Sequence, residues 1–232
     1  QYAELSAEGN AIDFGNLSTA NQGAGAVSSS TRCCYGGGNN NPSYFNKIEF
    51  VTIATTSNVT DFGDLAEIKS SLQGCGNETR GIFGPGFSPT PTNRNVNTIE
   101  FITIATLGNA QDFGDFTEDI RGIAALSSPT RGLFAGGVNL PSVTGYNLID
   151  FITIASTGNS TDFGDLTVTG QGVGANSNSI RGVFGGRTNP SKQQVIDFVE
   201  IATTGNAKDF GDLLNTFANC AGTSDSHGGL SE

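Results

Sequence analysis

Short runs of β-branched and aromatic residues alternate with glycine-rich turns along the whole chain. In the clearest unit, small residues at 172–177 are followed by Arg-Gly-Val-Phe-Gly-Gly at 181–186, and then by an apolar run at 195–203. The two-residue turn Gly205-Asn206 leads into Asp-Phe-Gly-Asp-Leu at 209–213. Such runs, separated by turn residues, predict four short strands, which we name a, b, c and d in chain order.

This unit recurs along the chain. The Phe of the Asp-Phe-Gly motif stands at positions 47 to 51 residues apart, namely Phe14, Phe62, Phe113, Phe163 and Phe210. An arginine recurs at the start of strand b, as Arg32, Arg80, Arg131 and Arg181. A period of this kind indicates a repeat architecture.

Strand c has apolar residues on both faces. In the first unit Ile48 and Phe50 point to one side, and Val51 and Ile53 point to the other. A strand of this type is covered on both faces. Stacked sheets that follow one another around an axis provide this cover.

A period near 50, four strands per unit and a Gly-Gly pair after strand b resemble the kelch repeat of β-propellers. Two features depart from that repeat: Phe62 and its equivalents replace the expected Trp, and variable loops replace the usual Tyr. The predicted fold is therefore kelch-like.

The chain ends predict how the ring closes. After residue 213 only strands a (217–222) and b (226–231) remain, whereas residues 2–7 and 13–17 match strands c and d. We therefore predict an all-β, five-bladed β-propeller with four antiparallel strands per blade, in one domain over residues 1–232. The predicted blades are 18–65, 66–116, 117–166, 167–213, and a last blade formed by 214–232 together with 1–17.

The recurring Phe and Arg positions are expected to be structural. Phe62 and its equivalents should wedge between blades, Gly63 should provide room or a bulge, and the Asp side chains should bond nearby backbone amides. For the arginines we expect a structural role, such as pairing with a recurring Asp; the alternative is a ring of five equivalent ligand pockets.

Recognition is expected in the variable b–c loops, because scaffold-borne loops commonly carry binding residues. These loops span 38–46, 85–97, 138–147 and 187–194, and the b–c and d–a connections share one face of the molecule. The candidate ligand-binding residues on them are Tyr44, Phe45, Phe87, Arg94, Tyr146 and Arg187.

No catalytic constellation, metal site or cofactor motif is predicted. The sequence contains one His and no C-x-x-C pair. Because Cys33, Cys34, Cys75 and Cys220 do not follow the repeat, we interpret them as free thiols that act as small apolar residues.

The charge excludes two partner classes. A net charge of −11 and a pI near 4.4 argue against nucleic acid and anionic membranes, both of which attract basic surfaces. The sequence contains no run of 18 apolar residues, so no membrane-spanning segment is predicted. Because the chain starts at Gln1 and contains no Met, we expect a processed product or part of a longer chain.

Three segments, at 201–213, 128–137 and 224–230, look like the kelch-like repeats of virion proteins from tailed bacteriophages, especially marine and cyanobacterial ones. The resemblance covers essentially the whole chain. It implies a non-enzymatic structural or adhesive module on a virion tail, fibre or capsid surface. The implied partners are other virion proteins, the remainder of a longer chain, or a host surface glycan. The alternatives are a five-bladed lectin with several weak sugar sites and, third, a glycoside hydrolase.

Overall fold

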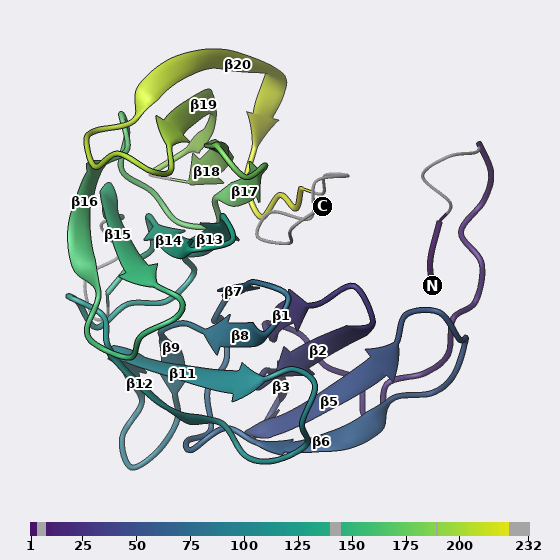
Figure 1. Cartoon of the computed structure of the whole chain (residues 1–232). Helices are drawn as coiled ribbons and strands as arrows, with labels where there is room; N and C mark the ends of the chain where they lie inside the picture. Colours follow the sequence, from purple (N-terminus) through teal and green to yellow (C-terminus); the bar gives the residue numbers. More distant parts are fainter. Residues whose placement is uncertain (4–7, 140–144, 189, 223–232) are drawn as a thin grey trace.

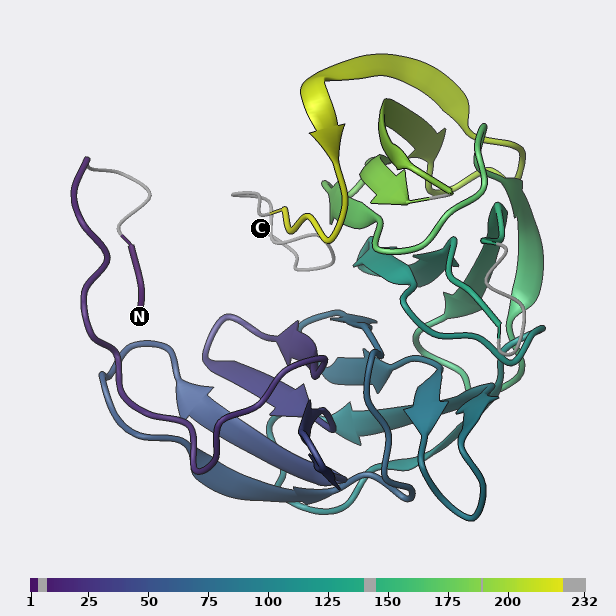
Figure 2. The same ribbon diagram turned by 180° about the vertical axis from the view of Figure 1, so that it is seen from behind.

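The computed structural model describes residues 1–3, 8–139, 145–188 and 190–222. All regular elements in these residues are β-strands, which confirms the predicted all-β class. Four four-stranded antiparallel sheets dominate, and each has its strands in the order predicted for one repeat, from a through b and c to d. Figures 1 and 2 show the sheets following one another around a central space.

The strand bounds repeat from sheet to sheet. Sheet 1 contains β1 (Gly25–Ser28), β2 (Arg32–Gly36), β5 (Lys47–Thr52) and β6 (Thr60–Asp64). Sheet 2 contains β7 (Gly74–Gly76), β8 (Arg80–Phe83), β11 (Thr98–Thr103) and β12 (Gln111–Asp115). Sheet 3 contains β13 (Ala124–Ser127), β14 (Arg131–Ala135), β15 (Leu148–Thr153) and β16 (Thr161–Asp165). Sheet 4 contains β17 (Gly174–Ser177), β18 (Arg181–Thr188), β19 (Lys192–Glu200) and β20 (Lys208–Phe217).

Two b–c loops form small hairpins. β3 (Asn39–Asn40) pairs with β4 (Ser43–Tyr44), and β9 (Gly86–Ser88) pairs with β10 (Arg94–Val96). These hairpins lie on the face that carries the predicted recognition loops.

The hydrophobic core lies between consecutive sheets. One cluster joins sheets 1 and 2 through residues such as Phe62 and Ile102, and equivalent clusters join sheets 2 and 3 and sheets 3 and 4. Phe62 is 3 % exposed. Phe113 and Phe163 are each 2 % exposed, so this Phe is buried between two sheets at all three joined interfaces.

The glycine of the Asp-Phe-Gly motif provides both room and a bulge. Ile99 pairs with Gly114 and Glu100 pairs with Asp112, so Phe113 is the extra residue of a β-bulge. Gly114 has φ of +144°, and a β-carbon there would lie 2.5 Å from the carbonyl oxygen of Gly158 in sheet 3. The glycine thus allows the c–d turn of the next sheet to approach closely.

The recurring arginine has a structural role, but the expected pairing with a recurring Asp is wrong. Arg80 stacks on Phe101, with 4.7 Å from its guanidinium carbon to the ring centroid, and donates a 2.9 Å hydrogen bond to the carbonyl oxygen of Ile154. Arg32 and Arg131 make the same two contacts in their own positions. Each arginine therefore ties its sheet to the next one.

The last repeat differs from the prediction. β20 continues to Phe217, past the predicted end at residue 213, because Phe217 still pairs with Gln193 of β19. The predicted strand a at 217–222 is not a strand beyond Phe217, and the predicted strand b at 226–231 lies outside the described residues.

The N-terminal segment lies against sheet 1. Tyr2 and Ile12 form an antiparallel bridge, and residues 13–17 run past the c–d turn of sheet 1 without being assigned as a strand. Residues 4–7 of the predicted strand c and residues 226–231 of the predicted strand b lie outside the described residues, and the described residues of the two chain ends do not pair with each other. Figures 1 and 2 show the N-terminal segment and β20 on opposite sides of an opening between sheets 1 and 4.

Candidate functional site

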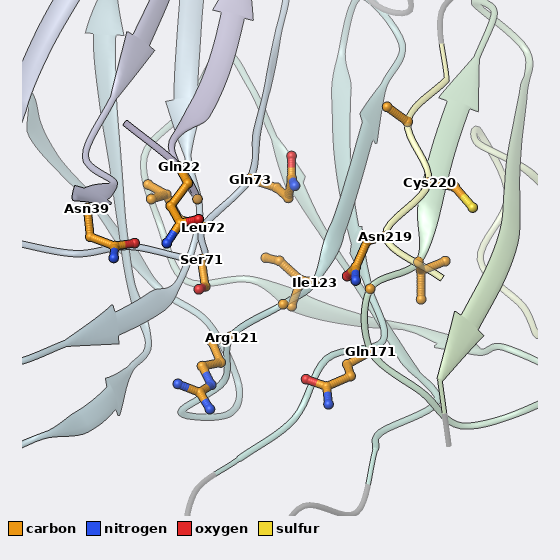
Figure 3. A pocket seen from close by; sticks show the side chains of 15 residues that line it. Gln22, Asn39, Ser71, Leu72, Gln73, Arg121, Ile123, Gln171, Asn219 and Cys220 are labelled. Carbon is orange, nitrogen blue, oxygen red and sulfur yellow. The ribbon is translucent and has the colours of Figure 1, made fainter. Parts of the chain in front are cut away.

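A cavity with a volume of about 770 Å³ lies at the centre of the sheet arrangement. Figure 3 shows its lining, which is mainly polar at the rim. All five repeats contribute to it, through residues 22–23, 71–73, 121–123, 171–173 and 219–221. The cavity is therefore lined by the connections before all four sheets and by the segment that follows β20.

Five equivalent residues with left-handed backbone surround this cavity. Their φ values lie between 54° and 67°, and they are Gly23, Ser71, Gly122, Gly172 and Asn219. Each amide from Ser71 onward donates to the carbonyl oxygen of the preceding member, at 2.7, 3.0, 3.0 and 2.7 Å. Glycine and Asn are the residues that adopt this conformation most readily. A chain of backbone hydrogen bonds thus links the sheets at the cavity.

Large polar side chains directly precede three of these residues. Gln22, Arg121 and Gln171 stand one position before Gly23, Gly122 and Gly172, and all three side chains line the cavity. Backbone bridges hold these three residues against the b–c loops: Gln22 pairs with Asn39, Arg121 with Val138, and Gln171 with Thr188. The rim is therefore built from d–a connections fixed by b–c loops.

Arg121 is supported by aromatic residues from two b–c loops. Its guanidinium carbon lies 5.2 Å from the centroid of the Phe87 ring, and the Phe87 and Tyr44 rings are 5.7 Å apart. Phe87 is 8 % exposed, so the ring on which Arg121 stacks is held in place by its own packing. Stacking on an aromatic face leaves the edge of a guanidinium free to donate hydrogen bonds.

The other predicted ligand-binding residues do not join this cluster. Phe45 packs under the Lys47 ammonium, at 5.1 Å, and Arg94 pairs with Glu67 at 3.5 Å. The backbone of Tyr146 donates to Gly137, and its side chain is half-buried. Arg187 is fully buried and forms a 2.7 Å ion pair with Asp197, so it is not available at the surface.

The sequence prediction missed the rim residues Gln22, Arg121 and Gln171. A signal for them exists, because a large polar residue precedes glycine in three d–a connections. Their convergence depends on the spatial proximity of the repeats and is not visible in any single unit.

A buried acid in each strand c was also missed. These acids follow the first Ile of the strand, and they are Glu49, Glu100, Asp150 and Asp197. Their partners differ: Glu100 pairs with Lys69 at 2.7 Å, whereas Asp150 accepts from Thr117 and Ser160 hydroxyls. Buried charges require such partners, and these groups belong to the scaffold.

Two of the four thiols are shielded from solvent. All four Cys are free, Cys34 and Cys75 are buried in the core clusters, and burial raises the pKa of each of these two thiols to about 12. These results agree with the interpretation of both as small apolar residues.

A second central cavity of about 290 Å³ lies along the inner strands and is lined largely by small residues of β1, β7, β13 and β17.

No group of three or more His, Cys, Asp or Glu that could hold a metal ion occurs within the described ranges. No helix in the same residues is long and apolar enough to cross a membrane.

No protein-family model matches the sequence, and a comparison with curated proteins gave no significant match.

Proposed function

We propose that the chain forms a closed five-bladed β-propeller that serves as a non-enzymatic structural or adhesive module of a bacteriophage virion. The observation that carries the architecture is that both chain ends already make contacts specific to a fifth repeat. The evidence lies on the two sides of the opening.

On the N-terminal side, Asn16 occupies the position of a d strand. Its backbone amide donates to Asn58 Oδ1 at 3.0 Å. The equivalent bond joins each pair of consecutive sheets, from Asp64, Asp115 and Asp165 to Asn109, Asn159 and Asn206. Tyr2 also packs edge-on against Phe14, at 5.9 Å, as Phe101 packs against Phe113.

On the C-terminal side, Asn219 occupies the fifth place around the central cavity. Its amide donates to the carbonyl oxygen of Gly172 at 2.7 Å, and its φ of 56° matches the other four members. Asn219 and Asn16 thus extend the repeat pattern from opposite sides toward one missing blade.

The faces beside the opening are apolar. Phe210 is 57 % exposed although its equivalent Phe163 is 2 % exposed, and Ile53 is 44 % exposed although Ile104 is 1 % exposed. A fifth blade covers both faces, and burial of apolar area stabilises by about 25 cal/mol per Å². Closure therefore buries the exposed side chains of Phe210 on sheet 4 and of Ile53 beside sheet 1.

Amide hydrogen exchange tests the closed ring. The amides of Gly108 and Ala110 donate to the carbonyl oxygens of Phe62 and Asp64. In a closed ring Gly9 and Ala11 make the equivalent bonds to Phe210 and Asp212, so we expect both amides to be protected. Fast exchange at Gly9 and Ala11 beside protected Gly108 and Ala110 would contradict closure.

The virion role is supported by the resemblance of the repeat motifs to phage virion proteins and by the architecture. A ring of packed sheets is a rigid scaffold, and its variable loops share one face. The proposed partners are other virion proteins, the rest of a longer chain, or a host surface glycan. Immunogold labelling of intact particles with antibodies against this chain should label the virion surface, and labelling confined to the infected cell would contradict the proposal.

The alternative is a lectin with five similar weak sugar sites. The recurring arginines, which would mark such sites, are used in contacts between sheets. A glycan array on the isolated chain identifies a sugar that binds, and calorimetric titration with that sugar distinguishes the two: the lectin shows a stoichiometry near five per chain, whereas the adhesive module shows fewer sites or none.

A further inference from the structure

The rim of the central cavity combines one unpaired cation with several amides. Of the other basic side chains, Lys47, Lys69, Arg94, Arg181 and Arg187 pair with carboxylates, and Arg32, Arg80 and Arg131 donate to carbonyl oxygens. Lys192 and Lys208 are exposed. In the part of the chain that the structure describes, the half-buried Arg121 guanidinium is stacked on Phe87 without a carboxylate or carbonyl partner.

Amide side chains surround the same central cavity. Figure 3 shows Gln22 and Asn39 on one side of the cavity, Gln171 next to Arg121, and Asn219 opposite. The Gln171 Oε1 atom lies 3.5 Å from the place where a β-carbon on Gly122 would be. Each primary amide offers two donors and one acceptor oxygen, which matches the hydroxyl groups of a sugar.

The cation selects a compact anion. A guanidinium donates two parallel hydrogen bonds to a carboxylate, and such charge-assisted bonds are about twice as strong as neutral ones. The protein carries a net charge of −11, which repels a multiply charged anion more strongly than an anion with a single negative charge. The volume of about 770 Å³ falls within the range of small-molecule sites, about 300–1,000 Å³.

We infer that the central cavity binds a carboxylated sugar unit, with Arg121 holding the carboxylate and Gln22, Asn39 and Gln171 bonding the hydroxyls. The site is single and asymmetric, because the residues equivalent to Arg121 in the other repeats are Gln22, Ser70, Gln171 and Ala218. This inference rests on the adhesive role proposed above and names the ligand class for it.

Galacturonic acid and galactose form a matched pair of probes, because they differ only in a carboxylate in place of a hydroxymethyl group. We expect galacturonic acid to bind at least tenfold more tightly in calorimetric titration, and to shift the NMR signals of the Gln22 and Gln171 side-chain amides. A tenfold ratio corresponds to 1.4 kcal/mol, the scale of one charge-assisted contact.

Arg121→Gln should weaken galacturonic acid binding at least tenfold and leave galactose binding unchanged. Arg121→Lys should restore less than half of the lost free energy, because Lys lacks the two-pronged donor geometry. Lys192→Gln removes the same charge from an exposed site and should have no effect. Thermal unfolding of each variant checks that the fold is intact.

Equal affinity for both sugars, no binding of either, or unchanged binding in Arg121→Gln would overturn the inference. Inorganic phosphate binding as tightly as galacturonic acid would also overturn it, because the amides would then add nothing. These outcomes leave the ring and the virion role untouched, which hydrogen exchange at Gly9 and Ala11 and immunogold labelling test separately.

Discussion

Arg80 donates a 2.9 Å hydrogen bond to the carbonyl oxygen of Ile154, which directly follows β15 of the neighbouring sheet and lies 74 positions further along the chain. The same guanidinium lies 4.7 Å from the Phe101 ring centroid of its own sheet. One side chain thus joins the middle of one sheet to the end of strand c in the next. The contact recurs at Arg32 and Arg131 and is a defining feature of the interfaces.

Arg80→Leu should therefore destabilise the protein. Loss of a charged hydrogen bond and of a cation–π contact together predicts about 2–4 kcal/mol in the free energy of unfolding. Urea denaturation measures the change. A shift below about 0.5 kcal/mol, the scale of an ordinary surface substitution, would show that the bond contributes little.

Arg181→Leu is the matched variant that reports on ring closure. Arg181 stacks on Phe198 at 5.0 Å, but its described polar partner is the exposed Glu200, a pair of a kind worth about 0–1 kcal/mol. In a closed ring Arg181 gains a carbonyl acceptor in the fifth blade, so its loss should cost as much as that of Arg80. A markedly smaller cost would indicate that the ring stays open.

Gly114→Ala tests the close approach between sheets. A β-carbon there would lie 2.5 Å from the Gly158 carbonyl, on a residue with φ of +144°. Backbone strain and overpacking together predict a loss of about 3–5 kcal/mol, seen as a lower urea midpoint. A loss no greater than about 1 kcal/mol would mean that the next turn moves away freely.

Gly211→Ala is the control for that steric argument. Gly211 has a similar φ of +140°, but a β-carbon on this residue would meet no atom within 4 Å. Strain alone predicts about 1–3 kcal/mol. If the ring closes, the c–d turn of the fifth blade occupies this space, and the two substitutions should cost the same.

The repeat and its strands could be predicted from the sequence because their signals are local. Alternation of apolar residues, turn glycines and the recurring Phe62 and Phe113 positions fix where each strand lies and which residues are buried. Each of these signals depends on residues that are close in sequence within one repeat, and the four sheets have the predicted strand order.

The contacts between repeats could not be predicted in the same way. The acceptor for Arg80 is a backbone carbonyl, which has no residue-type signature, and so a recurring Asp was expected instead. Arg121, Phe87 and Tyr44 come from three different repeats and meet only after the sheets are arranged. The partners of the buried acids also differ between repeats, so no common motif marks them.

The buried pair Arg187 and Asp197 predicts a large effect of breaking one partner. Both side chains are fully buried, and Asp197 also accepts from the Thr167 hydroxyl at 2.5 Å. Arg187→Met should cost about 3–5 kcal/mol in urea denaturation, because it leaves a buried charge without its partner.

Arg94→Met is the matched substitution at a surface pair. Arg94 and Glu67 are 3.5 Å apart and their side chains are 43 % and 24 % exposed, so the expected cost is about 0–1 kcal/mol. Equal costs for Arg94→Met and Arg187→Met would contradict the argument from burial.

The buried thiols predict that stability falls at alkaline pH. Burial raises the pKa of Cys34 and of Cys75 from 9.0 to about 12, so the folded protein disfavours both thiolates. The contribution of these two thiols to the free energy of unfolding is fully present below pH 9. It is lost as the pH rises from 9 toward 12, because the thiols of the unfolded chain release their protons at lower pH than those of the folded protein. The urea midpoint of the wild type should fall across this window.

The variant Cys34→Val and Cys75→Val removes both thiols and keeps apolar side chains in the core. Its urea midpoint should fall less than that of the wild type between pH 9 and 12, with the remaining loss due to other titrating groups. In the wild type at pH 8, a thiol reagent such as dithionitrobenzoate should label Cys34 and Cys75 only at the rate of unfolding. Rapid labelling of either Cys in the folded protein, or equal alkaline losses in the two proteins, would show that the thiols are accessible.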